Sequence, residues 1–300
     1  MKKITLLTLL TSAFTISLLS GCGNSNSTTY KIIIAGMTDS AERRKSIDFS
    51  DSYYQSELVL VCNSNDSSID FSHIYNKEEL STLLNGKILI SQTGTITDDM
   101  IKNVFVPEFN ATRANSVDSF TQASIIVTQG QAFAFTAELP VAQSYVNGSN
   151  GSLKILRLEN EILGKENLDQ LSVSIGIKKG KQEFLTSLNE ALSEISIDTR
   201  NDLMTQMVEF NAKNNEPNDN LRSPIKGSKG KIIVGLECNY PSFNWTETTQ
   251  NNYTYKLNGK SKEFAEGYDV EIAWLIAQKL DMTLEFEKME WDALLSWANL

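Results

Sequence analysis

Histidine is almost missing from this chain, and cysteine is rare. His73 is the sole histidine, which excludes a metal site built on several imidazoles and a Ser-His-Asp catalytic relay. The three cysteines, Cys22, Cys62 and Cys238, show no Cys-x-x-Cys spacing. We therefore expect Cys62 and Cys238 to be buried or incidental free thiols, and we expect neither a metal nor a cofactor.

Long apolar runs and clusters of positive charge are also missing beyond residue 22. No later segment approaches the run of about 20 apolar residues that a transmembrane helix needs. The formal net charge is −10, whereas binding of nucleic acid requires clustered Lys and Arg side chains. These properties argue against a nucleic-acid partner and leave a chain long enough for one or two domains with adequate cores.

The N-terminal segment is the exception. A positive start at residues 1–3 precedes an apolar stretch at residues 4–19 and the sequence LSGC, which ends at Cys22. This order is typical of a bacterial lipoprotein signal peptide covering residues 1–22. A transmembrane helix is disfavoured because the stretch is short, rich in Ser and Thr, and followed by the polar residues 23–29. We expect Cys22 to carry acyl chains that anchor the protein to the outer face of the cell membrane.

Four short apolar runs are each followed by a polar or glycine-bearing loop and then by a helical pattern. They cover residues 32–35, 88–90, 133–137 and 232–235. Runs of this kind that alternate with helices are typical of buried parallel strands in α/β units. Ligands of such open sheets bind outside the carboxyl ends of the strands, so we expect functional side chains in these loops.

Other segments have clear local signals. Apolar residues share one helical face at residues 270–280 and again at residues 184–195, while residues 283–287 alternate polar and apolar side chains like a strand. Residues 214–229 are polar, contain Pro217 and Pro224, and lack periodicity. We interpret them as a linker.

Three sequence motifs together resemble those of one family. They read GMT at 36–38 with ERRKSIDFSD at 42–51, AELPVA at 137–142, and ECNYPSFN at 237–244. They are similar to the extracytoplasmic solute-binding proteins for polar amino acids, which deliver ligands to ABC importers. In that family the motif that lies at residues 237–244 here precedes the other two. Residues 229–300 followed by residues 30–213 resemble one complete member, so we interpret the chain as a circular permutant.

The resemblance implies an α/β architecture of the type II periplasmic-binding-protein kind, with two lobes joined by a two-strand hinge. The expected hinge runs outward through residues 58–62 and back through residues 173–177. The first lobe then comprises residues 30–62, 172–213 and 230–300, and the second comprises residues 63–171. The resemblance also implies a monomer whose partners are an amino acid and a membrane permease.

Arg43 is the candidate for the ligand carboxylate. Asp39 and Glu42 have the spacing of a helix-capping pair, which predicts that Arg43 lies in the first turn of a helix, where a cation opposes the helix dipole. On this reasoning alone a surface position is equally good. The family resemblance favours binding through Gly36, Thr38 and Arg43, with Arg44 as the alternative in the next register.

Two further candidates come from the middle of the chain. The sequence QTGT at residues 92–95 precedes a good helix start, and the resemblance assigns Thr95 to the ligand carboxylate, although simple capping would also explain it. Relatives often carry a second hydroxyl next, where this chain has Ile96. Glu138 ends an apolar run and precedes Pro140, which suits a first helical position. A solvated acid is the alternative, and the resemblance makes Glu138 the partner of the ligand ammonium.

The remaining candidates lie near the C-terminal end of the sequence. Tyr240 and Trp291 occupy the two places where relatives enclose the ligand stem, whereas Phe243 is expected in the core. Glu237 is either an exposed loop acid or a second negative charge that, with the aromatic faces, would attract a cationic ligand.

These residues predict a lipid-anchored receptor that closes over a polar amino acid and presents it to a permease. An enzyme on the same fold, such as a cyclohexadienyl-dehydratase-like lyase with Glu138 as general acid, is a second hypothesis. A third is a broken tandem of two binding proteins that has no function alone. The identity of the bound amino acid is not encoded in any of these patterns, although the charges favour a polar or cationic one.

Overall fold

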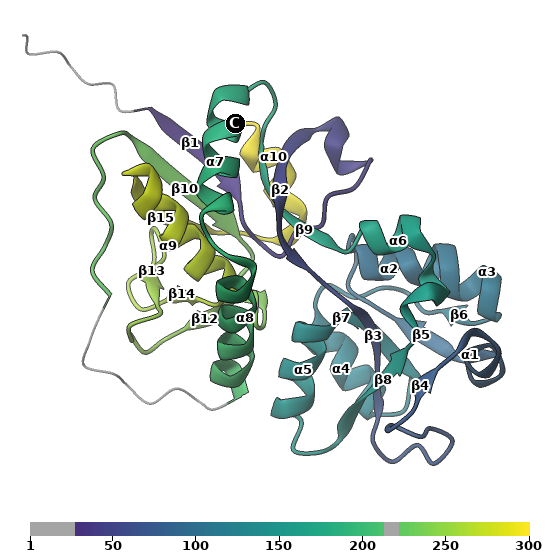
Figure 1. Cartoon of the computed structure of the whole chain (residues 1–300). Coiled ribbons are helices and arrows are strands. Elements are labelled where there is room, and N and C mark those ends of the chain that lie inside the picture. Colours follow the sequence, from purple (N-terminus) through teal and green to yellow (C-terminus); the bar gives the residue numbers. More distant parts are fainter. Residues whose placement is uncertain (1–27, 213–221) are drawn as a thin grey trace, which may run out of the picture.

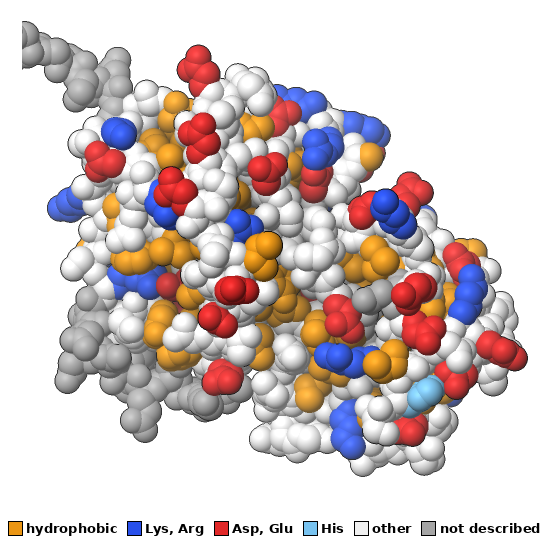
Figure 2. Space-filling model, in the orientation of Figure 1, with side chains coloured by type: hydrophobic (Ala, Val, Ile, Leu, Met, Phe, Trp, Pro, Cys, Tyr) orange, Lys and Arg blue, Asp and Glu red, His pale blue; other side chains and the backbone are white. Residues whose placement is uncertain are grey.

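The computed structural model describes residues 28–212 and 222–300, which form two α/β lobes (Figure 1). The predicted signal peptide with Cys22 lies outside the described residues, as do residues 214–221 of the predicted linker. No helix in the described ranges is long and apolar enough to cross a membrane. Acidic and basic side chains are interspersed over the face drawn in Figure 2.

The first lobe is built on a five-stranded sheet of order β15-β10-β1-β9-β2. Its strands are β1 (Thr29–Ile33), β2 (Ile47–Gln55), β9 (Ser172–Lys178), β10 (Lys231–Leu236) and β15 (Thr283–Lys288). Strand β10 pairs in parallel with both the central strand β1 and the edge strand β15, which confirms the parallel strands expected from the first and last apolar runs. Strand β9 is antiparallel to β1 and β2. The C-terminal part of the chain thus completes the sheet that β1 begins.

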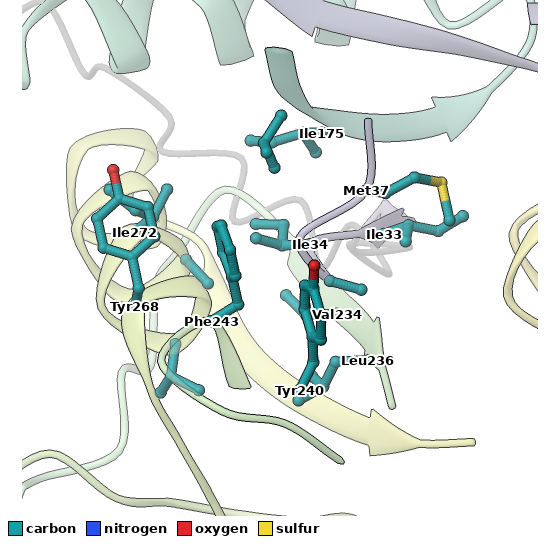
Figure 3. Close-up of a cluster of buried hydrophobic side chains, with 14 of the residues drawn as sticks. Ile33, Ile34, Met37, Ile175, Val234, Leu236, Tyr240, Phe243, Tyr268 and Ile272 are labelled. Atoms are coloured by element: carbon teal, nitrogen blue, oxygen red, sulfur yellow. The ribbon is translucent and has the colours of Figure 1, made fainter. Parts of the chain in front are cut away.

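The helices that pack on this sheet are α7 (Gln182–Ser193), α9 (Tyr268–Leu280) and α10 (Leu294–Ala298), whereas α8 (Ile197–Ala212) packs on α9 and on helix α5 (Leu139–Gly148) of the second lobe. The periodicity predicts α7 and α9. The predicted apolar faces of α7 and α9 are buried. Figure 3 shows Tyr268 and Ile272 of α9 near side chains of β1 and β10, in the core of the first lobe.

A small antiparallel sheet of order β11-β12-β14-β13 adds to the first lobe. Its strands are β11 (Asn239–Tyr240), β12 (Asn244–Glu247), β13 (Tyr255–Lys256) and β14 (Phe264–Glu266). It leads the chain from β10 to Gly267, after which α9 begins. The end of β12 and the loops around β13 form the long segment between the ECNYPSFN motif at residues 237–244 and α9.

The second lobe contains a six-stranded sheet of order β4-β8-β3-β7-β5-β6. Its strands are β3 (Leu58–Asn63), β4 (Ile74–Tyr75), β5 (Ile88–Ile90), β6 (Thr112–Arg113), β7 (Ala134–Glu138) and β8 (Leu153–Leu158). Its α-helices are α1 (Lys77–Leu84), α2 (Ile96–Met100), α3 (Val106–Phe109), α4 (Phe120–Thr128), α5 (Leu139–Gly148) and α6 (Lys165–Asp169). The runs at residues 88–90 and 133–137 correspond to β5 and β7, which are parallel as predicted.

The outward hinge was predicted at residues 58–62, and this prediction was wrong because the crossing lies just before that strand. Residues 58–62 form β3, which pairs with β7 and β8 inside the second-lobe sheet. The chain leaves the first lobe between Gln55 and Leu58 and returns just before Ser172, and the amide of Ser56 donates to the carbonyl of Leu171 at 3.1 Å between the two crossings. The apolar run of β3 indicates a buried strand but not the sheet to which that strand belongs, so the pattern could not place the crossing.

The described part of the predicted linker, residues 222–229, contains neither helix nor strand but packs on the first lobe. Arg222 and Glu271 of α9 form a buried ion pair at 2.7 Å, with the guanidinium 4.6 Å from the ring centroid of Trp274. The amide of Ile225 donates to the Tyr255 hydroxyl at 3.0 Å. This segment is therefore held against the first lobe by an ion pair and a hydrogen bond.

Candidate functional site

One pocket between the lobes contains all eight residues predicted to bind the ligand. In this closed state its free volume is about 10 Å³, roughly the room that one water molecule needs. The predicted residues are Gly36, Thr38, Arg43, Thr95, Glu138, Glu237, Tyr240 and Trp291. Gln92 and Ile96 complete the lining. The pocket lies at the carboxyl ends of β1, β10 and β15 in one lobe and of β5 and β7 in the other, as expected for open α/β sheets.

Arg43 spans the cleft. Its Nη1 donates to the carbonyl and to the Oγ1 of Thr38, both at 2.7 Å, and its Nη2 donates to the Gly94 carbonyl of the other lobe at 3.1 Å. The guanidinium lies 5.3 Å from the ring centroid of Trp291. Burial lowers the pKa of Arg43, and the nearby Glu138 charge opposes this shift. The planar group has five N–H donors, enough to hold a carboxylate in addition to these contacts.

A helical turn does begin at Arg43, but the predicted capping pair and a longer helix are absent, so this part of the local prediction was wrong. Residues Arg43–Lys45 form a single 3₁₀ turn without a side-chain cap, and strand β2 follows almost at once. Pairing of β2 with β9 leaves no room for a longer helix. Asp39 instead accepts from the exposed Arg44, with Nε to Oδ1 at 2.6 Å. Arg44 is absent from the pocket lining, so Arg43 is the residue that enters the cleft.

The loop after β5 supplies the opposing wall. Thr95 caps α2, because its Oγ1 accepts from the amide of Asp98 at 3.2 Å, while the same hydroxyl donates to the Gln92 carbonyl at 2.8 Å. The predicted helix start is thereby confirmed. Gly94 has φ +74°, and a Cβ there would lie 3.4 Å from Trp291 Nε1 of the other lobe. That distance is an ordinary van der Waals contact, so the left-handed backbone, and not the approach of the lobes, favours glycine here.

Glu138 ends β7 and is buried on the second-lobe side of the pocket. Its carboxylate accepts a hydrogen bond from the hydroxyl of Tyr240 in the first lobe. Burial raises the pKa of Glu138, and the hydrogen bond from Tyr240 and the charge of Arg43 oppose that rise. The hydrogen bond from Tyr240 therefore links the two lobes. It also favours the ionised form of Glu138, which burial without a partner would disfavour.

Glu237 follows β10 and is only 7 % exposed, which rules out the exposed loop acid. Its Oε1 accepts from Gln92 Nε2 at 3.0 Å across the cleft. Burial raises the pKa of Glu237 to about 7, and the nearby Glu290 and Asp292 add to the rise. Gln92, which sequence reasoning did not assign, could have been suspected because it opens the loop that carries Thr95.

The aromatic side chains form the remaining wall. Tyr240 stacks on the fully buried Phe243, with ring centroids 5.2 Å apart, so Phe243 is core as predicted. Figure 3 shows the two rings in the core of the first lobe. A Cβ added at Gly36 would lie 2.7 Å from the Tyr240 ring, which explains the glycine at that position. Trp291 donates from Nε1 to the Gly94 carbonyl at 3.3 Å. Cys62 and Cys238 are free and buried, as expected.

Beside the pocket, serine hydroxyls also join the lobes. Ser242 of the first lobe donates to the Pro140 carbonyl at 2.8 Å, and its Oγ lies 2.6 Å from Ser144 Oγ. With the bonds from Gln92, Arg43 and Tyr240 described above, these contacts hold the two lobes together around the pocket. The chain is therefore in a closed conformation.

Two α/β lobes with polar and aromatic side chains converging on a closed cleft define the class of two-lobed solute-binding proteins. The chain belongs to the bacterial extracellular solute-binding proteins, family 3, whose model matches residues 22–208. This confirms the predicted family and fold class, and it places the protein outside the cytoplasm. Residues 222–300, which supply Glu237, Tyr240 and Trp291, lie beyond the matched range.

Several solved structures are similar. The amino acid ABC transporter substrate-binding protein AbpA from Streptococcus pneumoniae, bound to L-arginine, is 21% identical over 61% of this chain and 68% of that chain, with a TM-score of 0.47. An ancestral arginine-binding protein bound to arginine is 26% identical over 58% and 70%, with a TM-score of 0.45. The ancestral amino acid-binding protein AncCDT-1, a precursor of cyclohexadienyl dehydratase, is 23% identical over 58% and 67%, with a TM-score of 0.44. No curated protein matches the chain.

Proposed function

We propose that this protein captures one α-amino acid between its lobes and delivers it to an ABC importer. The observation that carries the proposal is the convergence of Arg43, Glu138 and the two aromatic walls on one enclosed pocket. An amino acid requires a cation for its carboxylate, an acid for its ammonium and an apolar wall for its stem. Arg43 with Thr95 would take the carboxylate, Glu138 the ammonium, and Tyr240 with Trp291 the stem.

The charge balance of the pocket favours a cationic side chain. Arg43 and Glu138 would be neutralised by the two backbone charges of the ligand, which leaves Glu237 for the side chain. A buried carboxylate without a counter-charge is unfavourable, as the raised pKa of Glu237 reflects. A ligand ammonium or guanidinium would relieve this cost and would also face the rings of Tyr240 and Trp291.

The proposal includes a membrane anchor and a permease partner. Residues 1–22 have the pattern of a lipoprotein signal peptide, so lipid on Cys22 would hold a monomeric receptor at the extracytoplasmic face of the cell membrane. Closure of the lobes over ligand would give the permease a shape to recognise. Because the ligand contacts both lobes, it would bind the closed state preferentially.

We further propose that the chain is a circular permutant. The position of β10 between β1 and β15 supports this idea, because the late segment completes the sheet of the early one. The alternative is a broken tandem in which the late segment begins a second copy. In that case the late segment would pair with another chain or with residues beyond it, and the protein would elute from gel filtration as an exchanged oligomer rather than as a compact monomer.

A thermal-shift screen of the twenty amino acids tests the binding function. We expect stabilisation by one or a few of them, strongest for arginine or lysine. A ligand at 100 times its Kd should raise the free energy of unfolding by about 2.7 kcal/mol, because it binds the folded state alone. D-enantiomers provide the matched control. A complete absence of stabilisation by amino acids would overturn the proposal.

The pH dependence of binding tests the role of Glu237. Its raised pKa of about 7 means that it is protonated below neutrality in the free protein. A cationic ligand binds the ionised form, so the Kd should rise as the pH falls, by about a hundredfold between pH 8 and pH 5 if ligand returns the pKa to its ordinary value. Lys288, Glu290 and Asp292 are the other charged groups that act on this carboxyl.

The same shift predicts the opposite trend for stability without ligand. Because the folded-state pKa of Glu237 is raised, its contribution to stability is complete below the ordinary glutamate pKa and is lost as the pH rises through about 7.

Isothermal titration calorimetry from pH 5 to pH 8 measures the pH dependence of the Kd, with Glu237→Gln as control. A wild-type pH profile in that variant would remove Glu237 from the ligand site.

A lyase remains the second candidate, on one observation. The pKa of Glu138 is raised by burial, a condition that suits a general acid. Incubation with prephenate or arogenate decides between the candidates. Turnover that is lost in Glu138→Gln would favour the enzyme, whereas tight binding of amino acids without turnover would favour the receptor.

A further inference from the structure

A buried hydrogen-bond relay lies behind the pocket, centred on Asp269 of α9. Asp269 is completely buried. Its Oδ1 accepts from the hydroxyl of Tyr53 on β2 at 2.6 Å, and its Oδ2 accepts from Nδ2 of Asn244 on β12 at 2.7 Å. The carboxylate therefore connects the early segment of the chain with the late one. It does not line the pocket.

Each arm of the relay ends on a backbone amide of a pocket loop. The amide of Gly36 donates to the Tyr53 hydroxyl at 3.3 Å, and the amide of Cys238 donates to Asn244 Oδ1 at 2.8 Å. Gly36 lines the pocket itself, and Cys238 stands directly after Glu237 in the loop that leads to Tyr240. The relay therefore holds the two first-lobe loops that form one side of the cleft.

Both loop amides belong to residues in the left-handed conformation. Gly36 has φ +60° and Cys238 has φ +57°. For a residue with a Cβ, such as Cys238, this conformation is unfavourable and persists only where surrounding contacts impose it. The hydrogen bond from Cys238 to Asn244 is such a contact. Without it, we expect the loop that carries Glu237 to relax toward ordinary backbone angles.

The acceptor-only character of the carboxylate fixes the direction of both arms. Tyr53 has one hydroxyl proton, and because Asp269 takes it, the oxygen remains free to accept from Gly36. Asn244 must turn its amide nitrogen toward Asp269, so its oxygen faces the amide of Cys238. Burial raises the pKa of Asp269 to about 7, while the hydrogen bonds from Tyr53 and Asn244 favour its ionised form.

We propose that Asp269 is a positioning residue that orients the Gly36 and Glu237 loops of the ligand pocket through Tyr53 and Asn244. The effect on ligand affinity rests on the proposed binding function, whereas the effect on the loops does not. The closing experiment therefore measures loop and ligand separately.

Asp269→Asn breaks the relay at one arm whichever way the new amide turns. With its oxygen toward Tyr53, its nitrogen meets the nitrogen of Asn244; with its nitrogen toward Tyr53, the hydroxyl turns its proton toward the amide of Gly36. Either arrangement leaves a buried donor without an acceptor. Adding Asn244→Asp repairs the pattern, because the new amide at position 269 then donates to the new carboxylate at position 244, which still accepts from the amide of Cys238.

The experiment compares wild type, Asp269→Asn and the double variant Asp269→Asn/Asn244→Asp. Hydrogen exchange of the Gly36 and Cys238 amides, measured by NMR, should accelerate about tenfold or more for at least one of them in the single variant and return toward wild type in the double variant. The Kd for the amino acid that stabilises wild type should rise roughly tenfold or more and recover in parallel. Ile276→Ala, which destabilises the far end of α9, should leave both readouts unchanged.

Wild-type exchange and affinity in Asp269→Asn would overturn the proposal, as would a double variant that recovers neither. If the single variant does not fold, Tyr53→Phe takes its place. That change removes the acceptor for Gly36 alone, so exchange should accelerate at Gly36 and not at Cys238. Acceleration at neither amide would then refute the relay. If wild type binds no amino acid, the exchange data still test the relay while the proposed function fails.

Discussion

Arg43→Ala is expected to abolish measurable binding of the amino acid. Removing one partner of a buried, hydrogen-bonded charge pair costs about 2–5 kcal/mol, which corresponds to a rise in Kd by a factor on the order of a thousand. Arg43 also bonds Thr38 in one lobe and Gly94 in the other, so its loss weakens the closed state itself. Isothermal titration calorimetry with the ligand from the thermal-shift screen measures the change.

Arg44→Ala is the matched control. The two residues are neighbours with the same charge, but the Arg44 side chain is 59% exposed and pairs with Asp39 at the surface. Surface ion pairs contribute about 0–1 kcal/mol, so the Kd and stability should stay close to wild type. Should Arg44→Ala lose binding while Arg43→Ala keeps it, the ligand carboxylate would belong to a different cation from the one that enters the pocket here.

The closed pocket explains why a ligand would be selective. Tyr240 bonds Glu138, and Gln92 bonds Glu237, so both acids already have partners from the opposite lobe. A ligand must replace or share these bonds, and only one that supplies positive charge at both acids compensates for their burial. A neutral analogue of the same size would leave one of the buried carboxylates without the charge that favours its ionised form. Selectivity would then depend on the acids as much as on Arg43.

The sequence was sufficient to predict most of the residues that meet in the pocket, although not Gln92, because most of them follow a short apolar run. Strands of parallel α/β units end on one edge, and the family resemblance indicated the register of Arg43, Glu138 and Trp291 within the loops. The local structure around Arg43 could not be predicted in the same way. Asp39 and Glu42 fit a capping pattern, yet strand pairing of β2 with β9 dominates over that weak signal.

The position of the hinge and the Asp269 relay could not be predicted from the sequence, for a different reason. Strands β2 and β3 are separated by two residues, and although β2 is the more polar of the two, composition does not show which sheet a strand joins. Asp269 resembles an ordinary acid in the first turn of a helix, where it would favour the dipole. Its partners lie 216 residues before it, at Tyr53, and 25 residues before it, at Asn244, so only the fold brings the three together.

A chain that ends at residue 212 is expected neither to fold nor to bind ligand. It lacks β10, which forms five pairs with β1 in the centre of the sheet, and it lacks β15 and α9. The bare edge of β1 and the apolar side chains of β1 that pack toward β10 and α9 would be open to water and to other chains, so we expect aggregation. Glu237, Tyr240 and Trp291 would be missing from the pocket as well. Circular dichroism and gel filtration measure the loss.

The control keeps every described residue and changes only the order, with residues 222–300 placed before residues 28–212. Residues 29–31 line the same surface cavity as Ala298 and Leu300, so a short glycine-serine linker can join the two segments. This reordered chain should fold as a monomer and bind the same amino acid with a Kd within about threefold of the wild type, since the contacts of the native state are unchanged and only loop closure differs. A truncated chain that stays folded and binds ligand normally would show instead that the late segment is not part of the receptor.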